Sequence, residues 1–167
     1  MKKYLLLLLV SFIMLPISAQ QLKIGYFSYE AVLKAAPDYL SAKASIENLR
    51  KQYDTEIQIA QKDFNEKYEN FIENQDGMAS AIREKRQSEL QSILERNMAF
   101  KQESDRLLAK AEEEAFAPLR TKLDNAIKAL GSEKDFIVIL NTDNNAAPYI
   151  NPVFGEDVTE ILINRIR

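Results

Sequence analysis

The stretch from Tyr39 to Leu130 most strongly limits what this chain can fold into, because its apolar residues recur every three or four positions. In the part that precedes Asn74, the steps repeat every eleven residues, at Ile46, Leu49, Tyr53, Ile57, Ala60, Phe64, Tyr68 and Phe71. An eleven-residue repeat corresponds to about 3.67 residues per turn, which favours a nearly straight or slightly right-handed pair of helices over a left-handed heptad coil. A single narrow seam of this kind needs a helical partner on one side only.

A polar turn at residues 74–77 separates this first arm from a return arm with a less regular seam. The return seam is predicted at Ile82, Arg86, Leu90, Ile93, Asn97, Phe100, Ser104, Leu108, Ala111, Ala115, Leu119, Leu123, Ala126 and Leu130. Arg86, Asn97 and Ser104 interrupt it, and polar residues lower the apolar burial available there. We therefore expect a hairpin with a mobile middle and tip.

The two arms differ in length. At roughly 1.5 Å per residue, the first arm is about 52 Å long and the return arm about 80 Å, so the return arm overshoots by some 25 Å. The excess must pack on whatever the two ends of the chain form. The predicted fold is therefore mainly α, a long antiparallel helical hairpin at residues 39–118 with its tip near 74–78. It stands on a small strand-containing head from residues 20–38 and 119–167.

The head is predicted to hold three strands and two short helices. One strand is expected at Leu22–Phe27 and another, buried on both faces, at Phe136–Leu140. The third is expected at Ala147–Asn151, where Pro148 and Pro152 favour a position at the edge of the sheet. Ser28 is a plausible N-cap for a short helix that Pro37 closes, Gly131 should end the long helix, and residues 156–163 suit a final helix. Pro118 either kinks the return arm, as a possible hinge, or marks a break in it.

Composition excludes several kinds of chemistry. The chain has no Cys and no His, so thiol chemistry and the commonest general base and metal ligand are absent. Its four glycines lie too far apart to form a phosphate-binding loop. We therefore predict that the protein is not an enzyme and needs no cofactor or metal.

Residues 1–19 have the features of a cleavable export signal, with Lys2 and Lys3 ahead of an apolar run that ends at Pro16-Ile17-Ser18-Ala19. The apolar run is short of the roughly 20 residues that span a bilayer. Loss of the two lysines would leave a net charge of about −5, which argues against nucleic acid as a partner.

Several apolar residues flank the seam instead of lying on it. They are Ile59, Ile72, Leu94, Met98, Leu107 and Phe116. One interpretation is that they widen the core of the hairpin. The other is that some face outward and make weak, promiscuous contacts with unfolded chains.

The order of these segments resembles the Skp/OmpH family of periplasmic chaperones. The similarity lies in Ile24-Gly25-Tyr26-Phe27-Ser28 with Val32-Leu33 and Pro37, in the strand at 136–140, in Ala147-Pro148-Tyr149-Ile150, and in the ending Asp157-Val158-Thr159-Glu160-Ile161-Leu162. It implies a homotrimer whose head strands form a small barrel-like body, with hairpin tentacles around a cavity. There, unfolded outer-membrane proteins would be held without ATP in the periplasm. The candidate residues for the trimer body are Ile24, Tyr26, Phe136, Val138, Leu140, Tyr149 and Ile150.

One property departs from the family pattern. The better-studied members are strongly basic, whereas this chain has a pI of about 5.2. The acidic charge argues against contact with lipopolysaccharide or an anionic membrane. An alternative function is an exported coiled-coil adaptor that links envelope components; a clean seam would favour the adaptor, and the polar interruptions favour a flexible chaperone.

Overall fold

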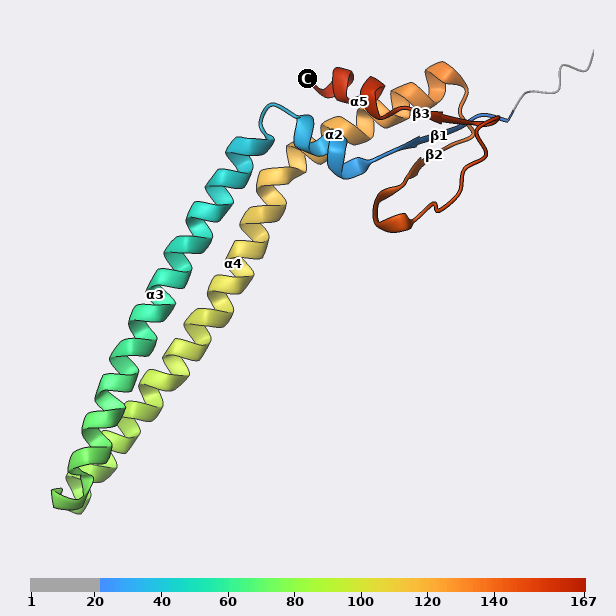
Figure 1. The fold of residues 1–167 in the computed structure, drawn as a ribbon. Helices are drawn as coiled ribbons and strands as arrows, with labels where there is room; N and C mark the ends of the chain where they lie inside the picture. Colours follow the sequence, from blue (N-terminus) through green and yellow to red (C-terminus); the bar gives the residue numbers. More distant parts are fainter. Residues whose placement is uncertain (1–21) are drawn as a thin grey trace, which may run out of the picture.

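A computed structural model describes residues 22–167, which form a long helical hairpin attached to a small head that contains a sheet (Figure 1). The predicted fold class is confirmed. The export signal expected at residues 1–19 lies outside the described residues.

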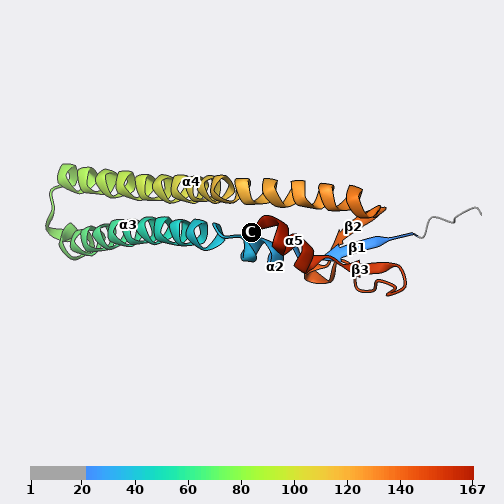
Figure 2. The same cartoon turned by 90° about the horizontal axis from the view of Figure 1, so that it is seen from above.

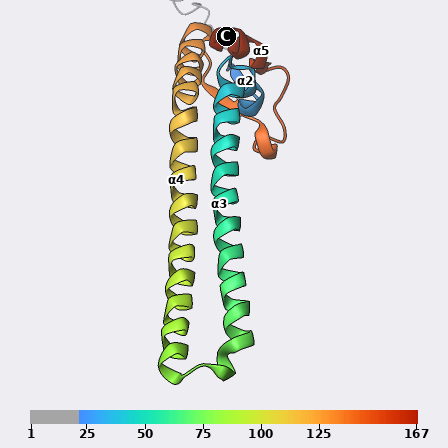
Figure 3. The same ribbon diagram turned by 90° about the vertical axis from the view of Figure 1, so that its left-hand side faces the viewer.

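The hairpin consists of two helices that run side by side (Figure 3). Helix α3 spans Tyr39–Asn74, the 3-10 turn η1 at Gln75–Gly77 forms the tip, and helix α4 spans Ser80–Lys134. The turn η1 lies within residues 74–78, where the tip was expected. With 55 residues against 36, α4 is longer than α3 by roughly 28 Å, and this excess enters the head as predicted.

The apolar seam of α3 faces α4. Ile46 and Phe71 are buried, and the other predicted seam positions are partly buried except for Tyr68. The Tyr68 side chain is 47% exposed, although its ring stacks on that of Phe64 with centroids 6.0 Å apart. The eleven-residue repeat thus predicts the contact face of this arm well.

The return seam differs from the prediction near the tip. Ile82, Arg86 and Phe100 are exposed, and Arg83 is partly buried instead. The guanidinium of Arg83 donates to the Met78 carbonyl oxygen at 3.3 Å. This contact lays the apolar stem of Arg83 over the end of the hairpin.

Two polar residues do lie in the return seam, and both have partners. Asn97 donates from Nδ2 to the carbonyl oxygen of Ala60 on α3 at 3.0 Å. Ser104 is buried and donates to the Phe100 carbonyl oxygen at 2.8 Å. Ser104 is buried and Asn97 is partly buried, and polar groups with partners are tolerated in such positions. The mobility expected of this region stays a prediction.

Pro118 lies inside α4, which continues through it without a break. Figure 1 shows α4 changing direction where the hairpin joins the head. Of the two interpretations of Pro118, the helix break is therefore wrong, and the kink is supported because proline removes a backbone donor and crowds the preceding turn.

Helix α4 ends later than predicted. It continues past Gly131 to Lys134, and Asp135 follows with φ of 55°. The N–H of Phe136 then donates back to the Gly131 carbonyl oxygen at 3.0 Å. The left-handed residue that closes the helix is therefore an aspartate, a residue type that tolerates this conformation better than most.

The head contains a parallel sheet of three strands in the order β2-β1-β3. Strand β1 spans Ile24–Phe27, β2 spans Val138–Asn141 and β3 spans Gly155–Asp157. Ile24 is in register with Val138 on one side and with Gly155 on the other. The central strand is thus the first one in the chain.

Two of the three predicted strands need correction. The run 136–140 forms a strand that is shifted by two residues at its start and is partly exposed, so it is not buried on both faces in the single chain. Residues 147–151 form no strand, and the third strand is β3. The prolines at 148 and 152 cannot donate to a ladder, and Asn151 instead accepts from the N–H groups of Phe154 and Gly155 in a local turn.

The core of the head lies between the last part of α4 and two short helices, α2 at Tyr29–Ala35 and α5 at Thr159–Ile166 (Figure 2). Its most deeply buried side chains are Leu123, Leu130, Leu162, Ile166, Val32 and Val158. Ser28 caps α2 as predicted, because its hydroxyl accepts from the Ala31 N–H at 3.1 Å.

The final helix was predicted to begin at Glu156, but it begins at Thr159. Glu156 and Asp157 instead extend β3, and the Asp157 carboxylate accepts from the Thr159 N–H at 2.9 Å. Lys122 of α4 donates to the Ile166 carbonyl oxygen, which fixes the end of α5. Within residues 22–167, no helix is both long enough and apolar enough to cross a membrane.

Candidate functional site

The apolar residues that flank the hairpin seam are divided between exposed and partly buried positions. Ile59, Ile72, Leu94 and Met98 are exposed, with Met98 at 65%. Leu107 and Phe116 are partly buried. The Phe116 ring lies 5.6 Å from that of Tyr39, so Phe116 joins the two arms at the base of the hairpin.

One side of the hairpin carries an apolar pocket of about 210 Å³. Its walls come from both arms, chiefly Ile57 and Phe64 on α3 and Leu94, Met98 and Phe100 on α4. Leu94 and Met98 are one turn apart and so share a side of α4. The structure thus brings two of the sequence-predicted candidates together with aromatic residues that were assigned to the seam.

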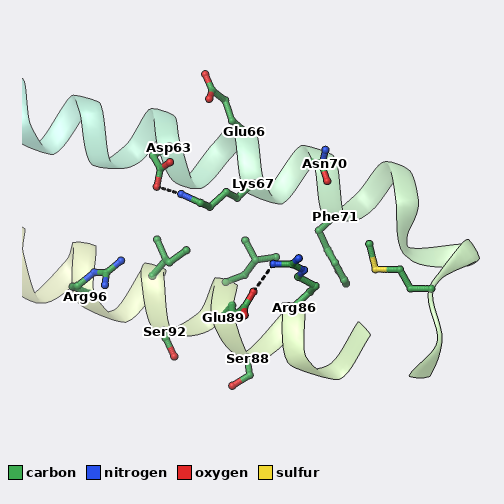
Figure 4. A pocket seen from close by; sticks show the side chains of 13 residues that line it. Asp63, Glu66, Lys67, Asn70, Phe71, Arg86, Ser88, Glu89, Ser92 and Arg96 are labelled. Carbon is green, nitrogen blue, oxygen red and sulfur yellow. Dashed lines mark hydrogen bonds and ion pairs between the residues drawn. The ribbon is translucent and has the colours of Figure 1, made fainter. Parts of the chain in front are cut away.

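The other side carries a larger and charged groove of about 720 Å³ near the tip (Figure 4). Asp63 pairs with Lys67 on α3, and Arg86 pairs with Glu89 on α4. At about 100° per residue, these α3 residues lie across the seam from those that line the apolar pocket. The hairpin therefore carries a mainly apolar pocket on one side, and on the other a groove that combines ion pairs with the apolar residues Phe71, Leu90 and Ile93.

Ion pairs between neighbouring turns cover much of the remaining surface of the arms. Examples are Lys62 with Glu66, Lys101 with Asp105 and Arg106 with Glu103. In the last pair, the hydrogen bond from Arg106 lowers the pKa of Glu103. Exposed pairs of this kind contribute little to stability.

The candidate residues in the head are less uniform than the sequence suggests. Val138 and Tyr149 are exposed, Tyr149 at 77%, and the others are partly buried: Ile24, Tyr26, Phe136, Leu140 and Ile150. Sequence reasoning missed the exposed apolar side chains of Ile137, Val153 and Phe154. The signal for Ile137 was present in the apolar run that contains it, but that run was assigned to the interior.

The sheet also has two open edges. Strands β2 and β3 each pair with β1 and with no other strand of the described chain. An unpaired strand edge leaves N–H and C=O groups free to bind another chain. Open edges beside exposed apolar residues make the head a candidate surface for association.

Comparison with protein families gives a match over nearly the whole described chain. A family model described as outer membrane protein (OmpH-like) matches residues 23–166. The chain belongs to the OmpH-like family. A comparison with curated proteins finds no match.

Solved structures show the same fold. A protein from Caulobacter crescentus CB15, described as an OmpH-like outer membrane chaperone, superimposes with a TM-score of 0.66 at 14% sequence identity. The match covers 87% of this chain and 83% of that one. The hairpin and the head of this OmpH-like chain therefore have a counterpart in a crystal structure.

The possible hinge of this OmpH-like chain lies between its two candidate surfaces. Pro118 is two residues from Phe116, at the base of the hairpin, and one residue from Leu119, which is buried in the head core. On the other arm, Pro37 separates α2 from α3. Both connections between hairpin and head thus include a proline.

Proposed function

We propose that this protein is an ATP-independent holdase chaperone of the periplasm that binds unfolded outer-membrane proteins and prevents their aggregation. The observation that carries this proposal is the apolar pocket between the two arms, with exposed Leu94 and Met98, combined with membership of the OmpH-like family. Scattered apolar side chains on two long arms suit many weak contacts with an extended chain. The description of the Caulobacter protein as an outer membrane chaperone supports the same function.

The proposal includes a homotrimer. The head buries a small core, and it leaves Ile137, Val153 and Tyr149 largely exposed beside open strand edges. A small domain with such a surface gains stability by self-association. Three copies joined at their heads would direct three hairpins around one cavity, where a client is retained by many contacts at once.

The test is an aggregation assay without nucleotide. An outer-membrane β-barrel protein denatured in urea is diluted into buffer with or without residues 20–167, and light scattering is followed. We expect stoichiometric trimer to suppress most of the scattering. Unchanged scattering would count against the holdase, and selective capture of a few folded envelope proteins would indicate the adaptor instead.

A further inference from the structure

The apolar pocket in the middle of the hairpin is formed by an interruption of the seam. Asn97 occupies a seam position, and its side-chain amide bonds the Ala60 carbonyl oxygen across the interface at 3.0 Å. Ala60 is itself the smallest residue of the α3 seam. A small residue opposite an amide leaves space that two interlocking apolar side chains would fill in a regular coil.

Aromatic rings surround this space. Phe64 and Phe100 line the pocket from opposite arms. Phe64 is stacked on Tyr68, and Phe100 meets Tyr53 edge to face with centroids 6.5 Å apart. Each of these two rings therefore contacts a second aromatic residue that does not line the pocket.

The pocket is partly open to solvent and has room for a small apolar group. Small-molecule and cofactor sites are usually about 300–1,000 Å³, which is larger than the 210 Å³ found here. An apolar cavity of about 150 Å³ binds benzene. The space therefore fits one aromatic ring.

The rim of the pocket restricts the charge of the occupant. Gln61, Asn65 and Asn97 are neutral and polar, and Lys101 is paired with Asp105 at 3.7 Å. A neutral ring with a polar edge, such as that of Tyr or Trp, can pack against the apolar lining and hydrogen-bond to the polar rim. The lining offers a charged ligand a single cation, Lys101, and Asp105 partly offsets its charge.

We propose that this pocket, which we name the ring pocket, binds single aromatic side chains of an extended client chain. The inference rests on the proposed function and deepens it, because it assigns to the hairpin a preference for aromatic residues over other apolar ones. One ring bound in each of three hairpins would hold a client at several points through individually weak contacts.

The chain has no Trp, so fluorescence at Trp wavelengths reports on a bound peptide alone. The probe is a neutral ten-residue peptide with one central Trp among Gly and Ser, titrated with intact residues 20–167. We expect saturable binding with a blue shift of the Trp emission. A peptide with Leu in place of Trp should compete at least tenfold more weakly than unlabelled Trp peptide.

The variant that tests the site is Gln61→Phe, which adds a ring at an exposed rim position and fills the pocket without altering the seam. Its matched control is Gln52→Phe, the same change at an exposed position of α3 that lines neither the pocket nor the charged groove. A second variant, Leu94→Ala with Met98→Ala, removes a wall of the pocket. We expect Gln61→Phe and the double variant to bind the peptide tenfold more weakly than the unaltered protein. Gln52→Phe should bind the peptide as the unaltered protein does. Circular dichroism should show that all three variants keep their helical content.

Equal peptide binding by Gln61→Phe and Gln52→Phe would overturn the ring pocket, as would equal competition by the Leu peptide. The aggregation assay of the preceding section is run on the same variants. Suppression of aggregation by the unaltered protein together with equal peptide binding would reject the ring pocket and keep the holdase. Failure of the unaltered protein to suppress aggregation would reject the holdase, whatever the peptide result.

Discussion

Asp143 joins two parts of the head that are far apart in the chain. Its carboxylate accepts the backbone N–H of Glu30, in the first turn of α2, at 2.8 Å. The hydroxyl of Ser28 and this N–H hold the pKa of Asp143 below its ordinary value. A lowered pKa in the folded state means that the ionised carboxylate stabilises the fold, and this stabilisation is lost as the pH falls through the folded-state pKa.

Replacement of Asp143 by Ala should lower the free energy of unfolding by about 1 kcal/mol at pH 7, since an exposed capping carboxylate is partly screened by water. Asp143→Asn should lose less, because it keeps an acceptor oxygen. The loss in Asp143→Ala should shrink once the pH drops below about 3.9, the ordinary pKa of Asp. Urea unfolding, followed by circular dichroism between pH 7 and pH 3, measures the difference in unfolding free energy between Asp143→Ala and the unaltered protein. A difference that does not change with pH would contradict the prediction.

Gly155 is the tightest glycine in the head. A Cβ atom there would lie 2.4 Å from Cγ2 of Ile150 and 3.2 Å from the Asn151 carbonyl oxygen. Gly155→Ala should therefore destabilise the protein by about 1–3 kcal/mol through overpacking. The control is Gly77→Ala at the tip, where a Cβ would meet nothing within 4 Å; equal urea midpoints for the two variants would refute the expectation.

At the scale of elements, periodicity predicted the long helices better than composition predicted the strands. The seam of α3 could be predicted because a repeat that runs from Ile46 to Phe71 averages out single exceptions such as Tyr68. Strand β3 could not, because Gly155-Glu156-Asp157 has neither apolar alternation nor β-branched residues and is held by pairing with β1. The ring pocket could not be predicted from the sequence either. Leu94 and Met98 were identified as residues that flank the seam, but periodicity does not give the register between α3 and α4 that places them opposite Phe64.

Pro118 offers a test of how the long helix is built. Its missing N–H and the bend of α4 predict weak protection of the preceding turn against hydrogen exchange. Pro118→Ala should slow amide exchange at residues 114–122 at least tenfold, because it restores a backbone hydrogen bond. Exchange at the tip, 75–83, serves as the internal control and should not change; unchanged exchange around position 118 would show that the bend has another cause.

At the scale of the whole molecule, the proposed trimer depends on the exposed apolar residues of the head. Light scattering after size exclusion should give a mass near three chains for residues 20–167. Tyr149→Asp combined with Val153→Asp should shift this mass to one chain, because the change places charges where Tyr149 and Val153 are 77% and 70% exposed. The matched control, Ile59→Asp on the hairpin, should remain trimeric. A single-chain mass for the unaltered protein would contradict the proposed trimer and with it the cavity that the proposed function requires.

Strand β1 precedes the hairpin in the chain, and both of its partner strands follow it. Ile24 finds its neighbours only in Val138 and Gly155, so both arms of the hairpin must be complete before the centre of the sheet has either partner. The arms can form early from local contacts, whereas closure of the head requires segments more than a hundred residues apart to meet, which is slow. Until the head closes, the apolar residues of β1 would lack their strand partners, and under the proposed function such a segment is one that other copies of this protein would retain.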